Sequence, residues 1–204
     1  MGKAKDTARK AAHQDRKATH RATRKQDGAL VRVAGKASEV ADQPPLIALS
    51  AATILLGAVL RRPAVARSGV RMLASHLLAT GVKTILKNAV DRTRPARAVK
   101  TGYRAGKGTG ADDPSLNSFP SGHTAGAVAV AQAVASENRL AALPLQAAAL
   151  GVAALQPSRG KHYLSDVIAG AAIGWAAERV ARAAIRAGEA GFEAGRARLM
   201  RRGA

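Results

Sequence analysis

The sequence predicts an all-α protein, a bundle of about five to six mostly apolar helices that crosses a membrane, with a disordered basic N-terminal tail. Three observations predict it. Apolar residues make up 47% of the 204 residues, yet aromatic residues make up only 2%. The apolar mass is Ala, Val, Leu and Gly, which favours closely packed helices over a β-sandwich rich in aromatic and β-branched strands. Short polar or basic turns separate the apolar segments. The length suits one domain.

The charge balance is strongly basic, with 33 Lys and Arg against 13 Asp and Glu and a formal net charge of +20. Such a balance indicates polyanionic neighbours: anionic lipid headgroups, phosphorylated substrates or nucleic acid. The sequence has no cysteine, so disulfides and thiolate metal sites are excluded. The N-terminus lacks the apolar core of a cleaved secretory signal.

Residues 1–42 are expected to form a basic tail, disordered or partly an amphipathic helix over 28–42. Residues 1–36 hold eleven Lys or Arg and three Asp, a net charge of +8. A segment of this composition does not bury enough apolar surface to fold alone. We expect it to touch an anionic membrane surface. Nucleic acid is a weaker candidate, because these residues contain no aromatic side chain to stack on bases.

Residues 43–187 form the expected helical domain, and 188–204 a second basic tail. The helix candidates are 46–60, 69–90, 122–136, 140–156 and 163–187, with a polar loop at 96–119. The first would span about 22 Å, less than the ~30 Å hydrocarbon core of a bilayer. None is a secure membrane span alone, so we expect antiparallel helix hairpins in or on a bilayer. A soluble helical bundle is the alternative.

Three polar clusters fall at the ends of these helices. Lys87 and Arg94 lie seven residues apart before Pro95, where two fixed cations suit a tetrahedral dianion. Ser121, Gly122 and His123 open the third helix candidate, where N–H groups bind anions and an imidazole can protonate a leaving oxygen. Alone, each has an ordinary explanation, a basic helix end or an N-cap.

The third cluster holds Arg159, Lys161 and His162, followed by Asp166. His162 and Asp166 are four residues apart, so on a helix they share a face and the carboxylate can orient the imidazole for attack. A simple helix-stabilising pair is the ordinary alternative. The order of the antiparallel helices nevertheless brings all three clusters to one face of the bundle, as a composite site requires.

This pattern resembles the type 2 phosphatidic acid phosphatase superfamily, which includes small bacterial membrane lipid phosphatases, acid phosphatases and vanadium haloperoxidases. The family's first signature, Lys, six residues, Arg-Pro, matches Lys87 to Pro95. Its second, Pro-Ser-Gly-His, matches Pro120 to His123. The end of its third, His, three residues, Asp, matches His162 and Asp166. The resemblance covers roughly residues 69–180.

The third signature departs from the family at one position. The family places an Arg six residues before the His, and this sequence has Gln156 there. Arg159 or Lys161 would then reach the phosphate by another path, or the site has one cation fewer.

The resemblance implies a role for each residue. His162 would be the nucleophile that forms a phosphohistidine, Asp166 would orient it, and His123 would be the general acid. The phosphoryl oxygens would be held by the other residues of the motifs: Lys87, Arg94, Ser121, Gly122 and Arg159. The resemblance implies no metal and no cofactor, since the cations do a metal's work.

We therefore expect a multi-pass membrane phosphatase acting on a lipid phosphate or pyrophosphate, with its site on the extracytoplasmic face. A soluble or peripheral acid phosphatase and a vanadate-dependent haloperoxidase are alternatives within enzymes. A catalytically degenerate protein that binds membranes or nucleic acid is the alternative from another class.

Overall fold

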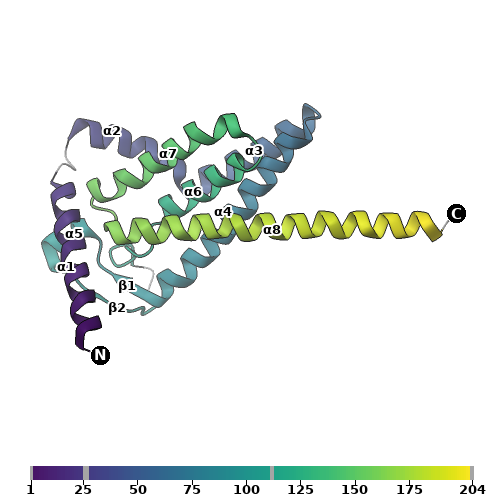
Figure 1. Cartoon of the computed structure of the whole chain (residues 1–204). Helices are drawn as coiled ribbons and strands as arrows, with labels where there is room; N and C mark the ends of the chain where they lie inside the picture. The colour runs from purple at the N-terminus through teal and green to yellow at the C-terminus, as the bar shows by residue number, and fades with distance from the viewer. Residues whose placement is uncertain (1, 25–27, 111–112, 203–204) are drawn as a thin grey trace.

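The structure is a computed structural model that describes residues 2–24, 28–110 and 113–202 (Figure 1). The described part holds eight α-helices, one 3-10 helix and two short strands. In chain order these are α1 (Gly2–Thr23), α2 (Ala29–Ala37), η1 (Ser38–Ala41), α3 (Gln43–Val59), α4 (Pro63–Ala89), β1 (Val90–Arg92), α5 (Pro95–Thr101), β2 (Ala105–Lys107), α6 (Gly122–Ala135), α7 (Arg139–Ser158) and α8 (Leu164–Arg202). The predicted all-α class is confirmed, with a small antiparallel β1–β2 ribbon added.

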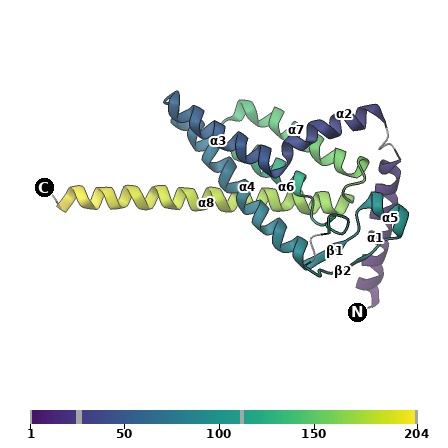
Figure 2. The same cartoon turned by 180° about the vertical axis from the view of Figure 1, so that it is seen from behind.

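The helices α4, α6 and α8 form the centre of the bundle, and α3 and α7 pack on its sides (Figures 1 and 2). The buried residues of one core cluster are all alanines, Ala79, Ala125, Ala129 and Ala177, and the partly buried Ile173 packs against them. Gly170 and Gly174 of α8 let that helix lie directly on α6. A Cβ on Gly174 would be 2.3 Å from the Ala125 carbonyl oxygen, so no larger residue fits without a shift. Small side chains thus bring these helices together, as the composition predicted.

The expectation of a disordered basic tail is wrong for residues 2–23, whereas the helix expected over 28–42 is present as α2 and η1. Residues 2–23 form α1, which lies across the ends of α7 and α8 (Figures 1 and 2). Its buried face is polar: Thr23 donates to the Pro157 carbonyl at 3.1 Å, and Leu164 N donates to Thr19 at 3.3 Å. The prediction of disorder rested on the low apolar content of this segment. It failed because α1 packs on the bundle through hydrogen bonds and ion pairs.

The expected boundaries also change at three other places. The C-terminal tail is not separate, because α8 continues to Arg202 and projects far beyond the bundle (Figure 1). The polar loop 96–119 contains α5 and β2. The helix expected to stop before Pro157 runs through it to Ser158, since a proline near the last turn removes little of the backbone bonding.

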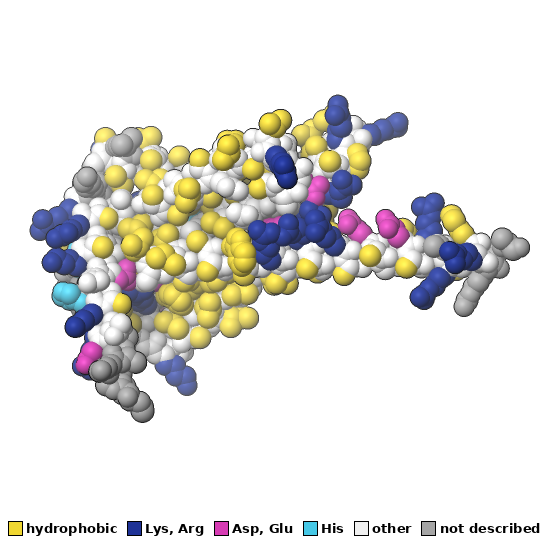
Figure 3. All heavy atoms as spheres, in the orientation of Figure 1, with side chains coloured by type: hydrophobic (Ala, Val, Ile, Leu, Met, Phe, Trp, Pro, Cys, Tyr) yellow, Lys and Arg dark blue, Asp and Glu magenta, His cyan; other side chains and the backbone are white. Residues whose placement is uncertain are grey.

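One helix of the described residues, Arg139–Ser158, is long and apolar enough to cross a membrane. A second candidate is the pair Val31–Ala41 and Gln43–Val59, bent by 55°. Exposed apolar side chains cover the middle of the face in Figure 3, with Lys and Arg gathered towards both ends. Leu150 of α7 and Ile168 and Trp175 of α8 are among the exposed apolar residues.

Candidate active site

The ends of four segments meet around one polar cavity of about 260 Å³. The end of α4, the residue before α5, the start of α6 and the α7–α8 connection each contribute side chains, and the segment around η1 closes the remaining side. The lining residues are Glu39, Asp42, Lys83, Lys87, Arg94, Gly122, His123, Lys161 and His162. The structure thus places five of the eight residues selected from the sequence around one pocket: Lys87, Arg94, Gly122, His123 and His162.

His162 lies in the α7–α8 connection, where it is buried with its ring on the pocket. Its Nδ1 is 2.6 Å from the Ser118 carbonyl oxygen. A carbonyl only accepts, so Nδ1 carries the proton and Nε2 keeps its lone pair. Burial and then the positive charge of Arg94 lower the pKa of His162 well below its usual value. A neutral imidazole with a free nitrogen is the form that can act as a nucleophile.

Asp166 does not hold His162 in the way the sequence spacing suggested. His162 precedes α8, so the two residues do not share a helix face, and His162 Nδ1 is 4.0 Å from Asp166 Oδ2. That oxygen instead accepts from Ser118 Oγ at 2.6 Å and from Tyr163 N at 2.8 Å, the latter in the manner of a helix capping box. The carboxylate therefore acts on His162 through Ser118, whose backbone carbonyl binds the ring.

Arg92 is a functional candidate that the sequence reasoning missed. It is buried, and its guanidinium donates to both Asp166 and Asp15, the latter at 2.9 Å, while lying 4.1 Å from the centre of the Tyr163 ring. It thus neutralises the buried Asp166 and ties α1 to the site. The available signal was its place two residues before Arg94: in an extended segment such residues point the same way.

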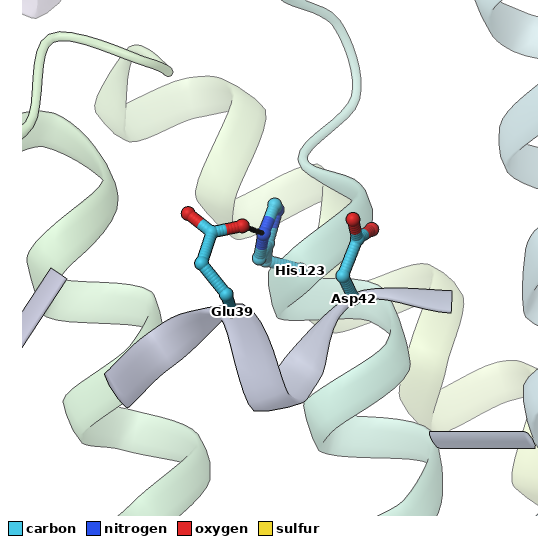
Figure 4. Close-up of side chains that lie close together, drawn as sticks. All are labelled: Glu39, Asp42 and His123. Carbon is cyan, nitrogen blue, oxygen red and sulfur yellow. Dashed lines mark hydrogen bonds and ion pairs between the residues drawn. The ribbon is translucent and has the colours of Figure 1, made fainter. Parts of the chain in front are cut away.

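His123, the second residue of α6, also lines the pocket. Its Nε2 donates to Glu39 Oε2 at 3.2 Å (Figure 4). Ser121 is the N-cap of α6: its buried hydroxyl accepts from Thr124 N at 3.5 Å and lies 3.0 Å from Thr124 Oγ1. Ser121 is therefore placed next to the lining residues and does not itself line the pocket.

The cations of the third signature are arranged differently from the expectation. Arg159 donates to Glu39 and to Ser38 Oγ, the latter at 2.8 Å, and does not line the pocket. Gln156 is buried, and its amide donates to the Val152 carbonyl of its own helix at 2.9 Å. Lys161 does line the pocket, together with Lys83. Lys83 is four residues before Lys87, a helical spacing that could have identified it.

Glu39 and Asp42 were missed because the sequence analysis assigned them to a tail outside the domain. With His123 they form a group whose ligand atoms all lie within 4.8 Å of one another (Figure 4). Carboxylates and imidazole suit a divalent cation. Glu39 already accepts from Arg159 and Lys161, however, and Lys83, Lys87 and Arg94 line the same pocket, so the residues present fit a metal ion poorly.

The helical bundle joins two histidines and several cations around one pocket, an arrangement that suits enzymes acting on phosphate esters. A sequence model of the PAP2 superfamily matches residues 68–187. This is more than half of the chain, so the chain belongs to the PAP2 superfamily and is a phosphatase of that family, a phosphomonoester hydrolase.

Two solved structures share the fold. One is LpxE from Aquifex aeolicus, with 19% identity and a TM-score of 0.58, covering 81% of this chain and 92% of that chain. The other is a transmembrane PAP2-type phosphatidylglycerolphosphate phosphatase from Bacillus subtilis, with 17% identity and a TM-score of 0.63, covering 86% of each chain. No curated protein sequence gave a significant match. At these identities the likeness establishes the fold alone.

Proposed function

We propose that the protein hydrolyses the phosphate or pyrophosphate of a membrane lipid through a phosphohistidine intermediate. The observation that carries the proposal is His162, a buried neutral imidazole with its free Nε2 in a pocket lined by cations. The fold is shared with the phosphatidylglycerolphosphate phosphatase from Bacillus subtilis, which the proposal takes as support for a lipid substrate.

In the proposed first step, His162 Nε2 attacks phosphorus and the bond from phosphorus to the leaving oxygen breaks. His123 donates its proton to that oxygen, so the alcohol or phosphate leaves neutralised. Lys87, Arg94 and the Gly122 N–H at the start of α6 hold the phosphoryl oxygens, and Ser121 orders that turn. Water then attacks the phosphorus of the phosphohistidine, with His123 now taking the water's proton. The bond from phosphorus to His162 Nε2 breaks, its electron pair returns to Nε2, and inorganic phosphate leaves.

Two lysines supply charge that the third signature lacks at Gln156. Lys83 and Lys161 line the pocket, so the phosphoryl group meets four cations there with Lys87 and Arg94. Arg159 does not line the pocket and contributes positive charge only indirectly, through its ion pair with Glu39. Asp166 acts through Ser118 on the ring of His162.

We further propose that the bundle lies in the membrane with the pocket at the extracytoplasmic end. The exposed apolar residues of α3, α4, α7 and α8 support burial in lipid. Arg61 and Arg62 of the α3–α4 turn and Arg139 at the start of α7 lie at the ends of the helices away from the pocket. Positive turns favour the cytoplasmic side.

The test is a phosphatase assay of the full chain in detergent micelles containing EDTA, with lipid phosphates and soluble phosphate esters side by side. Release of phosphate from the lipid phosphates is expected, and His162→Ala should abolish it. His20→Ala, which removes an exposed imidazole on α1, should leave the rate unchanged. Activity that survives His162→Ala would rule out the phosphohistidine route, and a preference for soluble esters would contradict the lipid substrate.

A further inference from the structure

Two carboxylates, Glu39 and Asp42, line the pocket from outside residues 68–187, the part matched by the PAP2 superfamily, and Glu39 makes the closest contacts there. Glu39 belongs to η1, the short helix that links α2 to α3. Its Oε2 accepts from His123 Nε2 at 3.2 Å, and its Oε1 accepts from Lys161 Nζ at 2.8 Å and from Arg159 (Figure 4). A single side chain therefore joins the proposed general acid to the two basic residues nearest His162 in the sequence.

The bond to Glu39 leaves His123 with one ring nitrogen, Nδ1, for the leaving oxygen. A general acid needs a fixed ring and a proton held until the leaving bond breaks. Burial, and then the positive charge of Lys161, lower the pKa of His123, while the hydrogen bond to Glu39 opposes that shift. The titratable and charged groups that line the pocket with His123 are Lys83 and Lys87 of α4, Arg94 before α5, Lys161 and His162 of the α7–α8 connection, and Glu39 and Asp42 of the η1 segment.

We propose that Glu39 is a positioning residue of the reaction, which orients His123 through Nε2, keeps it protonated for transfer to the leaving group, and holds Arg159 and Lys161 beside the pocket. The inference rests on the proposed function. It explains why η1 packs at the pocket: Ser38, next to Glu39, accepts from Arg159 at 2.8 Å, and Gly35 lies against the Arg159 side chain, where a Cβ would be 2.9 Å from Nε. The segment from Gly35 to Glu39 therefore packs against the side chain of Arg159, which pairs with Glu39.

The alternative role for the Glu39 carboxylate is that of a stand-in anion, which occupies the phosphate site of the free enzyme in place of a phosphate. Substrate would then displace it. The two roles predict opposite effects when the charge is removed. A stand-in would then no longer compete with phosphate, so affinity would rise. If Glu39 is a positioning residue, removal of its charge leaves the affinity for phosphate nearly unchanged and slows proton transfer from His123.

The experiment compares wild type with Glu39→Gln, which keeps a hydrogen-bond acceptor and removes the charge. kcat should fall about tenfold, less than the roughly 10²–10⁴-fold that a general acid contributes. The alkaline limb of the kcat–pH profile should move down by about one pH unit, and KM should change less than about threefold. The acid limb, which reports His162, should stay in place.

Two variants separate charge from geometry. Glu39→Asp keeps the charge on a shorter side chain, so the alkaline limb should stay near the wild-type pH while kcat falls. Asp42→Asn removes the same charge from a neighbouring side chain and should move that limb less than half as far as Glu39→Gln. Circular dichroism melting of each variant checks that the fold is kept.

A second measurement does not depend on turnover. NMR titration of the full chain in detergent, with labelled histidine and with His123 identified by a His123→Gln variant, should show the His123 midpoint about one pH unit lower in Glu39→Gln. An unmoved midpoint, or a rise in phosphate affinity with an unmoved limb, overturns the inference. A wild-type protein inactive on every phosphate overturns the proposed function, while the titration still decides the role of Glu39.

Discussion

At the scale of single residues, the site depends on which nitrogen of each imidazole is occupied. The Ser118 carbonyl engages Nδ1 of His162, and the Glu39 carboxylate engages Nε2 of His123. These bonds leave Nε2 of His162 and Nδ1 of His123 for the proposed reaction, the first as nucleophile and the second towards the leaving oxygen. Ser118 itself is held by Asp166, whose charge Arg92 neutralises. A chain of buried polar groups thus fixes the ring of His162.

The lowered pKa of His162 predicts a stability change with pH. In the folded protein the imidazole stays neutral below pH 6.5, whereas the unfolded chain takes up a proton there. The unfolded state then binds more protons, so this group makes the fold less stable as the pH falls below about 6.5, by at most about 1.4 kcal/mol per pH unit.

The measurement is the thermal midpoint of wild type and of His162→Gln between pH 7.5 and pH 5.5. The wild-type midpoint should fall more steeply on acidification, because the variant lacks this proton uptake. Equal slopes in the two proteins would show that His162 titrates normally in the fold. Carboxylates titrate in both proteins, so the difference between the slopes isolates the imidazole.

At the scale of elements, the pocket exists because α8 starts beside the start of α6. Ser121 N donates to the Asp166 carbonyl at 3.0 Å, and a Cβ on Gly170 would be 2.4 Å from the Ser121 carbonyl oxygen. Backbones in direct contact set the distance between the turns that carry His123 and His162. Gly174, one turn further along α8, continues this contact.

Gly174→Ala should therefore separate α6 from α8. The new Cβ meets backbone, which has little freedom to move, and overpacking of this kind costs roughly 1–3 kcal/mol. The thermal midpoint and the phosphatase rate should both fall. The matched control is Gly191→Ala on the same helix, where a Cβ meets nothing within 4 Å. That change should keep the rate and stabilise the helix by about 0.5–1 kcal/mol. Equal behaviour of the two variants would contradict the close contact.

At the scale of the whole molecule, charge and apolar surface are separated along the bundle. Apolar residues cover much of the bundle face in Figure 3, and basic residues lie on α1 at one end and on α8 at the other, both where α8 leaves the bundle and further along it. Leu140, Leu143 and Leu150 of α7 are all exposed. A soluble protein seldom exposes so much continuous apolar surface, which supports a lipid environment.

The corresponding prediction concerns extraction from membranes. The full chain should stay with the membrane fraction through washes with high salt and alkaline carbonate, and should dissolve only in detergent, because apolar contact with lipid is insensitive to salt. Release by salt alone would indicate that the basic residues hold the protein on an anionic surface. Immunoblots of the wash and pellet fractions measure the outcome.

Much of this protein follows from local sequence. Small apolar residues at helical spacing predicted the all-α class, and the motifs around Pro120 and His162 selected residues that the structure brings to one pocket, because caps, turns and motif spacing are local properties. Three features depended on contacts between distant residues: the docking of α1 through Asp15, the neutralisation of Asp166 by Arg92, and the approach of Glu39 to His123. Each joins segments at least 70 residues apart, so no window of the sequence contains both partners. Only tertiary packing decides such pairs, since their charges become strong partners once burial removes the competing water.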